Sequence, residues 1–257
     1  MTCRLVGSVS NMLVTLSDCT LAELLVTALS QEVEDGQVVA VGGPSPILAA
    51  AALLARASHA PSITILRLGA DGYWPFHGSS KEVLDLGERG LFDVFLLPAP
   101  KVDGRGVAVY DADHLSGRFP GGLGTRRLYH LAKRAVLFAE THSRDTFVPR
   151  LEPTPDTGPP LLPMSGVAEP YALFTPLCRF DFHESRWRLA ALHPGVTTDE
   201  VAAATGYSYS QDDPLKTTEW PDATMLRLLR TTIRAQLGER YPDFAAGAFG
   251  RGTASGT

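Results

Sequence analysis

The sequence has few cysteines, no long apolar run and no surplus of basic residues. Its three cysteines, Cys3, Cys19 and Cys178, are odd in number and far apart, which excludes a disulfide framework and a zinc site and fits a reducing compartment. No apolar run reaches the roughly 18 residues that a membrane span needs. Since 28 Asp and Glu outnumber 23 Lys and Arg, the chain has no positive surplus to neutralise nucleic-acid phosphates. We therefore expect a cytoplasmic protein that binds neither membranes nor nucleic acids.

Several catalytic signatures are also missing. No serine stands in the G-x-S-x-G turn of α/β-hydrolases, and the seven histidines contain no H-x-x-x-H pair. The turn Gly42-Gly43-Pro44 lacks the third glycine of a dinucleotide-binding loop. We expect no metal site, and surface or helix-capping roles for His77, His114 and His142. His77 and His114 are also candidate acid–base groups, because their loops could approach the site.

Short apolar runs alternate with helical patterns along most of the chain. The runs at 38–41, 63–66, 92–97 and 134–140 have the length and composition of strands buried in a parallel sheet. Such alternation predicts an α/β fold with an open, mostly parallel sheet and helices on both faces. Two further strands are predicted at 171–182 and 186–191.

Helix starts are marked by capping residues. Thr20 with Glu23 and Thr197 with Glu200 have the capping-box spacing, and Ser45 stands as an N-cap before Pro46. The first helix is expected to end at Asp35-Gly36, and a last helix is expected over 222–236. We expect one domain over 19–243, an N-terminal extension over 1–18 and a flexible tail over 244–257.

Ligands of open parallel sheets bind at the carboxyl ends of the strands. Gly42, Gly43 and Ser45 follow the first predicted strand and precede a helix, whose free N–H groups favour an anion or a developing oxyanion. A tight turn without a ligand is the alternative interpretation.

Motifs along residues 20–240 together resemble one known family. They are Phe180-Asp181-Phe182 followed by His193-Pro194-Gly195, the Val102-Asp103-x-x-Gly loop, and Phe119-Pro120-Gly121-Gly122. In order and spacing they are similar to the β subunits of family I CoA-transferases. This resemblance implies a separate α subunit in an αβ or α2β2 enzyme. It also implies an acyl-CoA as the small-molecule ligand, with coenzyme A part of the substrate and no tightly bound cofactor.

The resemblance also marks a departure at the expected nucleophile. In glutaconate CoA-transferase-like β subunits a catalytic glutamate stands two residues before a glycine, and here Arg67 stands two residues before Gly69. A guanidinium stays protonated and cannot carry CoA covalently, although it can hold a carboxylate or stabilise an enolate. A structural or solvent-facing arginine is the alternative.

The glycine-rich segment resembles the part of the family that lies beside CoA. On that resemblance Phe119, Gly121, Gly122 and Gly124 are candidate CoA-binding residues ahead of a helix.

Three functions follow from these observations. The first is a β subunit that cleaves a C–C bond in an acyl-CoA, by hydrolytic ring opening or decarboxylation, as relatives without the glutamate do. The second is true CoA transfer with a nucleophile supplied elsewhere. The third is a noncatalytic subunit that binds acyl-CoA or stabilises its partner.

Overall fold

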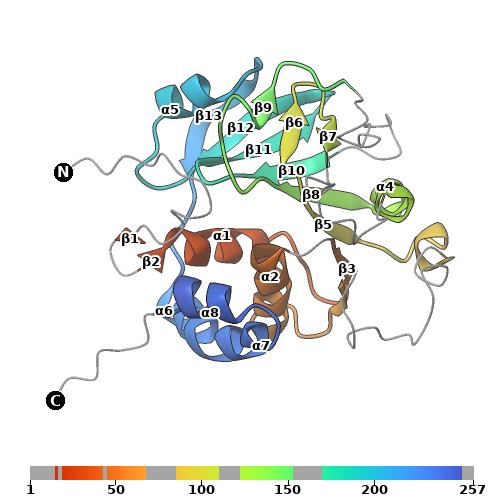
Figure 1. Ribbon diagram of the computed structural model, residues 1–257, viewed down its shortest axis with the longest axis vertical. Helices are drawn as coiled ribbons and strands as arrows, with labels where there is room; N and C mark the ends of the chain where they lie inside the picture. The colour runs from red at the N-terminus through yellow and green to blue at the C-terminus, as the bar shows by residue number, and fades with distance from the viewer. Residues whose placement is uncertain are drawn as a thin grey trace.

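An eight-stranded sheet runs through the molecule (Figure 1), in the order β13-β12-β11-β10-β8-β5-β3-β4. The computed structural model describes residues 15–16, 19–42, 45–67, 85–109, 122–152 and 170–250. Five adjacent strands are parallel: β4 (Thr64–Arg67), β3 (Val38–Val41), β5 (Val94–Pro98), β8 (Arg134–Phe138) and β10 (Pro170–Phe174). β11 (Cys178–His183) and β12 (Arg186–Leu192) continue the sheet antiparallel, and β13 (Ser210–Thr217) pairs parallel with β12. The prediction of an open, mostly parallel sheet is confirmed.

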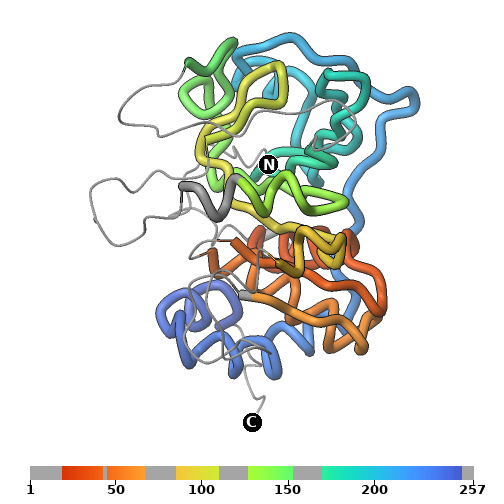
Figure 2. Tube along the Cα trace, turned by 90° about the vertical axis from the view of Figure 1, so that its right-hand side faces the viewer, coloured from red at the N-terminus to blue at the C-terminus, as the bar shows by residue number. Residues whose placement is uncertain are grey.

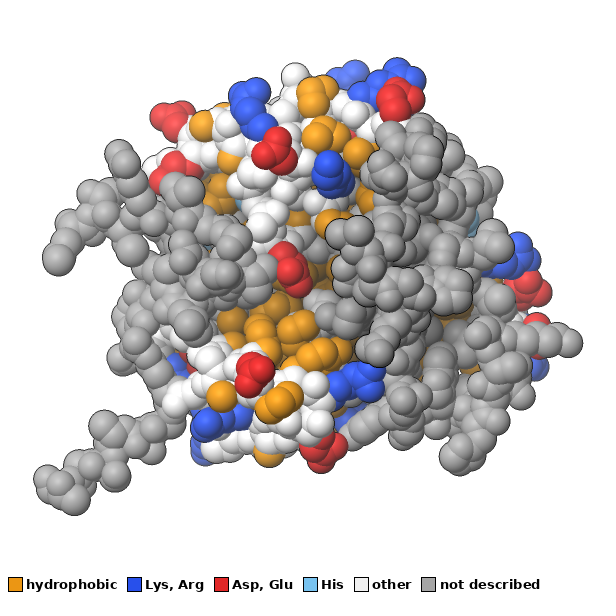
Figure 3. Space-filling view, in the orientation of Figure 1, with side chains coloured by type: hydrophobic (Ala, Val, Ile, Leu, Met, Phe, Trp, Pro, Cys, Tyr) orange, Lys and Arg blue, Asp and Glu red, His pale blue; other side chains and the backbone are white. Residues whose placement is uncertain are grey.

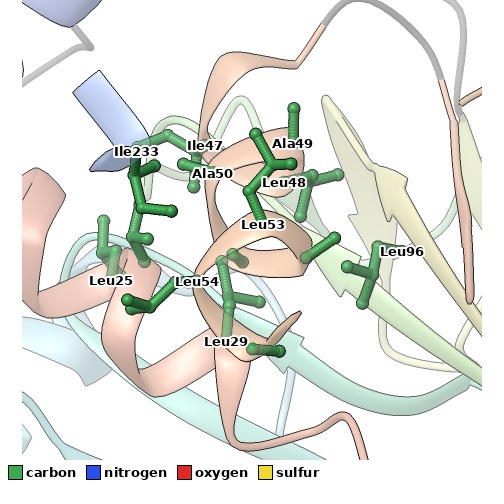
Figure 4. Packing of buried hydrophobic residues seen from close by; sticks show 14 of the residues in the cluster. Leu25, Leu29, Ile47, Leu48, Ala49, Ala50, Leu53, Leu54, Leu96 and Ile233 are labelled. Atoms are coloured by element: carbon green, nitrogen blue, oxygen red, sulfur yellow. The ribbon is translucent and has the colours of Figure 1, made fainter. Parts of the chain in front are cut away.

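One face of the parallel strands is covered by helices from both ends of the sequence. α1 (Leu21–Ser30) and α2 (Pro46–Ala57) pack on it through Leu25, Leu54 and neighbouring residues (Figure 4). Alternate strand residues, among them Val39, Leu96 and Val136, point into this cluster. Burial of so much aliphatic surface, at about 25 cal/mol per Å² of apolar area, is the main stabilisation of this half of the molecule.

The C-terminal segment completes the same layer. α6 (Ala223–Leu228), the π-helical turn η2 (Leu229–Ile233), α7 (Arg234–Gly238) and α8 (Pro242–Ala248) follow one another. Figures 1 and 2 place them beside α1 and α2, with Ile233 pointing toward α2 in Figure 4. Ala245, Ala248 and Phe249 are buried, so the prediction of a flexible tail is wrong for residues 244–250. The predicted helix 222–236 is interrupted by the π turn.

The opposite face carries a second core. α4 (Gly122–Leu131), α5 (Thr198–Ala204) and a small sheet pack on it around the fully buried Trp187. The small sheet has the order β7-β6-β9, formed by β7 (Ala108–Val109), β6 (Lys101–Asp103) and β9 (Phe147–Val148). Helices on both faces are therefore confirmed.

The capping residues act as the sequence indicates. Thr20 and Glu23 exchange both bonds of a capping box at the start of α1, and Thr197 and Glu200 do so at α5. α1 ends at Ser30, earlier than predicted, because two turns occupy residues 31–36. A short β1 (Thr15–Leu16) pairs with β2 (Cys19–Thr20) just before α1.

The surface seen in Figure 3 carries charges of both signs. Figure 3 shows hydrophobic side chains gathered near the middle of the face seen in Figure 1, with acidic and basic side chains interspersed around them. Among the described residues no helix is long and apolar enough to cross a membrane. Cys19 and Cys178 are both free and buried.

Candidate active site at the carboxyl edge of the sheet

The order of the parallel strands determines where a ligand crevice forms. β3 lies between β4 and β5. The connection through α2 leads from β3 to β4 on one side of β3, and β5 and β8 lie on the other side. α2 covers one face and α4 the other. The carboxyl ends of β3 and β5 are therefore the topological switch point, at which α/β sheets bind their ligands.

Gly42 occupies that switch point. Its N–H donates to the carbonyl oxygen of Leu96 on β5 at 2.9 Å. A Cβ at this position would lie 2.8 Å from Leu97 Cδ1 and 3.0 Å from Phe95 Cε2. Close packing of β3 on β5 thus requires glycine here, whether or not a ligand approaches. Gly43 lies outside the described residues.

Ser45 caps the helix that follows. It is buried, and its Oγ accepts from the N–H of Leu48 at 3.4 Å, with Pro46 at the first helical position. Because α2 starts only a few residues after β3, its N-terminus lies at the carboxyl edge and directs its remaining N–H groups there. The predicted cap is confirmed, and a role for Ser45 toward a ligand stays a prediction.

Arg67 ends the neighbouring strand. It is the register partner of Val41, one residue before Gly42, so the two chain ends are one strand spacing, about 4.8 Å, apart. The fold thus brings Arg67 and Gly42 to the same edge of the sheet. The structure describes the backbone of Arg67 and not its side chain.

The remaining predicted residues divide into two groups. Gly69, His114, Phe119 and Gly121 lie outside the described residues. Gly122 and Gly124 lie in the first turn of α4, so this helix begins earlier than predicted. α4 leads into β8 after two residues, so its N-terminus lies at the carboxyl edge, the side on which Gly42 lies.

Glu140 was not singled out by the sequence analysis. It follows β8 at the carboxyl edge, and burial raises the pKa of its carboxyl group above the usual range. More than a third of the residue stays exposed, so this loss of water is partial. The signal that could have found it is its place directly after a predicted strand.

His142 is not a surface or capping histidine, and that prediction is wrong. Its Nδ1 lies 2.9 Å from Thr175 Oγ1 and its Nε2 lies 3.0 Å from Thr205 Oγ1. The ring stacks on Phe147 with 4.1 Å between centroids. Burial lowers the pKa of His142 to about 3, so the ring is neutral at physiological pH and joins the ends of β8 and β10 to α5.

Asp103 gives a structural basis to the Val102-Asp103-x-x-Gly loop. The fully buried carboxylate accepts hydrogen bonds from the backbone N–H groups of Arg105, Val107 and Leu151 and pairs with the guanidinium of Arg105. Gly106 closes the turn with φ +78°. All of these contacts lie within the small sheet and its loops. Among the described residues, no group of three or more His, Cys, Asp or Glu side chains could hold a metal ion.

Comparison with solved structures identifies the fold. The decarboxylase AibA/AibB is 29% identical, with 90% of this chain and 100% of that chain covered and a TM-score of 0.71. IpdAB of Rhodococcus jostii RHA1 is 19% identical over 84% of this chain and 94% of that chain, with a TM-score of 0.62. Glutaconate coenzyme A-transferase of Acidaminococcus fermentans is 16% identical over 84% and 95%, with a TM-score of 0.67. The chain has the family I CoA-transferase fold.

The resemblance noted in the sequence therefore extends to three dimensions. The two less similar CoA-transferase-fold structures, both under 25% identical, show the fold alone. No family model matches the chain, and no curated protein matches it. Arg67 ends β4 at the carboxyl edge of the sheet, next to the strand that leads into Gly42.

Proposed function

We propose that this chain is one subunit of a two-subunit enzyme that cleaves a C–C bond in an acyl-CoA thioester, with decarboxylation the favoured reaction. The observation that carries the proposal is the arginine at the end of β4, beside the switch point, where the resemblance places the glutamate nucleophile of a CoA-transferase. The 29% identity to a decarboxylase over 90% of the chain supports the choice of reaction.

The chemistry of each group supports this reaction over transfer. CoA transfer by this family requires a carboxylate that attacks the thioester, and a guanidinium has neither the lone pair nor a pKa that would allow it. Decarboxylation requires a group that holds the departing carboxylate and a site that stabilises the resulting thioester enolate. Arg67 suits the first task through bidentate hydrogen bonds. The N-termini of α2 and α4 suit the enolate oxygen or the phosphates of CoA.

The partner is proposed to be a separate CoA-transferase-like α subunit. The name AibA/AibB denotes two components. In the proposed complex the α subunit would close the crevice at the carboxyl edge.

The experiment is a product analysis of the purified complex with its α partner. A panel of dicarboxylic and ring-derived acyl-CoAs would be offered with and without an added acid. Carbon dioxide with a shortened acyl-CoA is the expected result. An opened ring without loss of carbon dioxide would indicate hydrolytic cleavage instead. CoA moved to the added acid would contradict the proposal, and tight acyl-CoA binding without turnover would favour a noncatalytic subunit.

Variants of Arg67 sharpen the test. Arg67→Lys keeps the charge but loses the bidentate geometry, and we expect kcat/KM to fall about 10- to 100-fold, the value of one or two charge-assisted hydrogen bonds. The matched control is Arg150→Lys, since the Arg150 side chain is 65% exposed and pairs with the exposed Glu152. Equal loss in both variants would contradict a role for Arg67 in binding the substrate.

A further inference from the structure

Two histidines that follow different strands share one residue, Thr175, in the turn between β10 and β11. His142 Nδ1 lies 2.9 Å from the Oγ1 atom of Thr175, and His193 Nε2 lies 2.9 Å from its carbonyl oxygen. The second nitrogen of each ring contacts another threonine, Thr205 at the end of α5 and Thr218 after β13. Thr175 is therefore the point at which four distant segments are joined to β10.

The hydroxyl partners of His142 determine where its proton lies. The Thr205 hydroxyl donates to the carbonyl oxygen of Val201 at 2.7 Å, so its oxygen accepts from the Nε2–H group of the ring. Thr175 Oγ1 already accepts from two backbone N–H groups of its own turn, each at 3.1 Å, so its hydroxyl donates to Nδ1. The neutral ring thus uses every donor and acceptor. A second proton, on Nδ1, would face an oxygen without a free lone pair.

The surroundings of the two rings supply no negative charge. Cys178 Sγ lies 3.9 Å from His142 Nδ1, but burial raises the pKa of this thiol to about 12. Within the described ranges, no carboxylate forms a hydrogen bond or an ion pair with either ring. Burial, and then the charge of His193, lowers the pKa of His142. The other titratable or charged groups on the surrounding segments are Tyr207 and Tyr209, Glu140, Arg144 and Asp145 beside His142, and Lys216 and Glu219 beside Thr218.

Polar contacts hold α5 to the rest of the molecule. Among the seven described residues of this helix, only Val201 is buried. Besides the contact of His142, Arg144 Nε donates to a carbonyl oxygen near the end of α5 at 2.9 Å, and the N–H of Gly206 donates to the carbonyl oxygen of Phe147 at 2.7 Å. An element with so little buried apolar surface opens at a lower free energy than the sheet does.

His193 belongs to the same unit, because it begins the connection 193–197 that leads into α5. The three polar contacts of α5 all lead to residues 142–147. Residues 142–147 and 193–206 therefore hold each other in place, and both carry a histidine that rests on Thr175.

We propose that His142, Thr175 and His193 form a pH-sensitive latch, in which uptake of one proton by each ring releases residues 142–147 and 193–206 while the parallel strands stay folded. The neutral rings hold the latch closed. In the open segments both rings reach water and bind a proton near the ordinary histidine pKa of 6.5, whereas in the closed latch two charges would be buried close together. Opening therefore becomes more favourable as pH falls below about 6.5. The inference does not depend on the proposed function.

Hydrogen exchange of the full-length protein between about pH 7.5 and about pH 5 tests the latch. Each proton taken up on opening raises the opening constant about tenfold per pH unit, so two protons give up to about 100-fold per unit. After correction for the intrinsic exchange rate, residues 142–147 and 193–206 should lose protection with this slope, while β3 and β5 keep theirs. Protection of the two segments that does not change with pH, or its loss in all segments together, would overturn the inference.

His142→Gln and His193→Gln separate the two rings. Glutamine donates and accepts hydrogen bonds but takes up no proton, so each variant should reduce the slope to about tenfold per pH unit. The double variant should show no slope, and a wild-type slope in it would contradict the latch, because the protons would then be bound elsewhere. His183→Gln is the matched control, since the His183 side chain is 70% exposed, and it should keep the wild-type slope.

Thr205→Val gives a readout that leaves both histidines in place. The variant removes the hydroxyl that accepts from His142 Nε2, so the two segments should open more readily at every pH, with the slope of the wild type. Unchanged protection in Thr205→Val would show that the contact of His142 does not hold α5, and would overturn the inference even where the histidine variants fail to fold.

Discussion

The Nε2 atom of His193 lies 2.9 Å from the carbonyl oxygen of Thr175. A carbonyl oxygen only accepts, so Nε2 carries the proton, and Nδ1 accepts from the hydroxyl of Thr218 at 2.8 Å. His193 is 1% exposed. The neutral ring therefore has both nitrogens satisfied and ties the end of β12 to the ends of β10 and β13. Burial lowers the pKa of His193 to about 4.

Stability should depend on this ring below neutral pH. The unfolded chain takes up a proton near the ordinary histidine pKa of 6.5, whereas folded His193 resists protonation until about pH 4. The stabilisation is fully present above the unfolded pKa and falls as pH decreases, by up to about 1.4 kcal/mol per pH unit for each such histidine. His142, with a pKa of about 3, contributes in the same direction.

Urea unfolding between about pH 7.5 and about pH 5 measures the effect as a slope of unfolding free energy against pH. His193→Gln should lower stability and reduce that slope, because one proton-linked group is removed. His183→Gln is the control, since the His183 side chain is 70% exposed. Equal slopes for wild type and His193→Gln would show that His193 does not resist protonation.

Substitution of Gly42 tests the close approach of β3 to β5. The new Cβ of Gly42→Ala would meet Leu97 and Phe95 at 3.0 Å or less, and overpacking of this kind costs about 1–3 kcal/mol. Gly238→Ala in α7 is the control, because a Cβ at that position would have nothing within 4 Å and alanine favours a helix. Urea unfolding should show a loss for the first variant and none for the second. An unchanged free energy of unfolding in Gly42→Ala would show that the packing of β3 on β5 does not require glycine at this position.

Much of the fold followed from local signals in the sequence. The strand over 38–41, the Ser45 cap and both capping boxes are where the sequence placed them, because each depends on a few adjacent residues. The sequence did not predict β13, because its polar residues and Pro214 are typical of a loop. An edge strand is paired on one side only and tolerates both features.

Contacts between segments that lie far apart in the chain could not be predicted from local sequence patterns. His142 lies between Thr175 and Thr205, and no local pattern joins these three residues. The π-helical turn over 229–233 leaves the apolar periodicity of the predicted helix nearly unchanged. For the site, the structure places Gly42 and Arg67 at the carboxyl edge of the sheet, and their role toward a ligand stays a prediction. Glu140, which also follows a strand at that edge, was predicted only as the end of a strand.

The ion pair between Glu23 and Arg230 joins α1 to the C-terminal helices. Arg230 Nε and Nη2 lie 2.6 and 3.0 Å from the two carboxylate oxygens, and the Glu23 side chain is 1% exposed. Arg230→Met would leave a buried charge without this partner, which should cost about 3 kcal/mol in the free energy of unfolding. Arg150→Met, at an exposed pair, should cost at most about 1 kcal/mol.

A double-mutant cycle separates the free energy of the ion pair from the contributions of the two side chains taken singly. In Glu23→Gln with Arg230→Met no buried charge remains, so the loss should be smaller than the sum of the two single losses. Strict additivity of the two losses in urea unfolding would show that the ion pair contributes nothing of its own.

Asp103 offers the last test, directed at the loop that resembles the CoA-transferase pattern. In Asp103→Asn one carboxylate oxygen becomes an NH₂ group. It can still accept from Arg105 and Val107 at one oxygen, but the amide nitrogen would face the N–H of Leu151 and the Arg105 guanidinium, which are themselves donors. A buried donor left unsatisfied, together with an unpaired guanidinium, should cost about 3 kcal/mol.

Trp187 provides a local probe for that experiment, because its indole N–H donates to the carbonyl oxygen of Asp103 at 2.9 Å. Urea unfolding followed by tryptophan fluorescence should show a lower midpoint for Asp103→Asn and a wild-type midpoint for Asp145→Asn, whose native side chain is exposed. In this structure Asp103 closes the hairpin of β6 and β7 against the second core, so acyl-CoA affinity of the folded Asp103→Asn complex should stay close to wild type. A selective loss of acyl-CoA affinity with unchanged stability would contradict the structural role and indicate that Asp103 contacts the ligand.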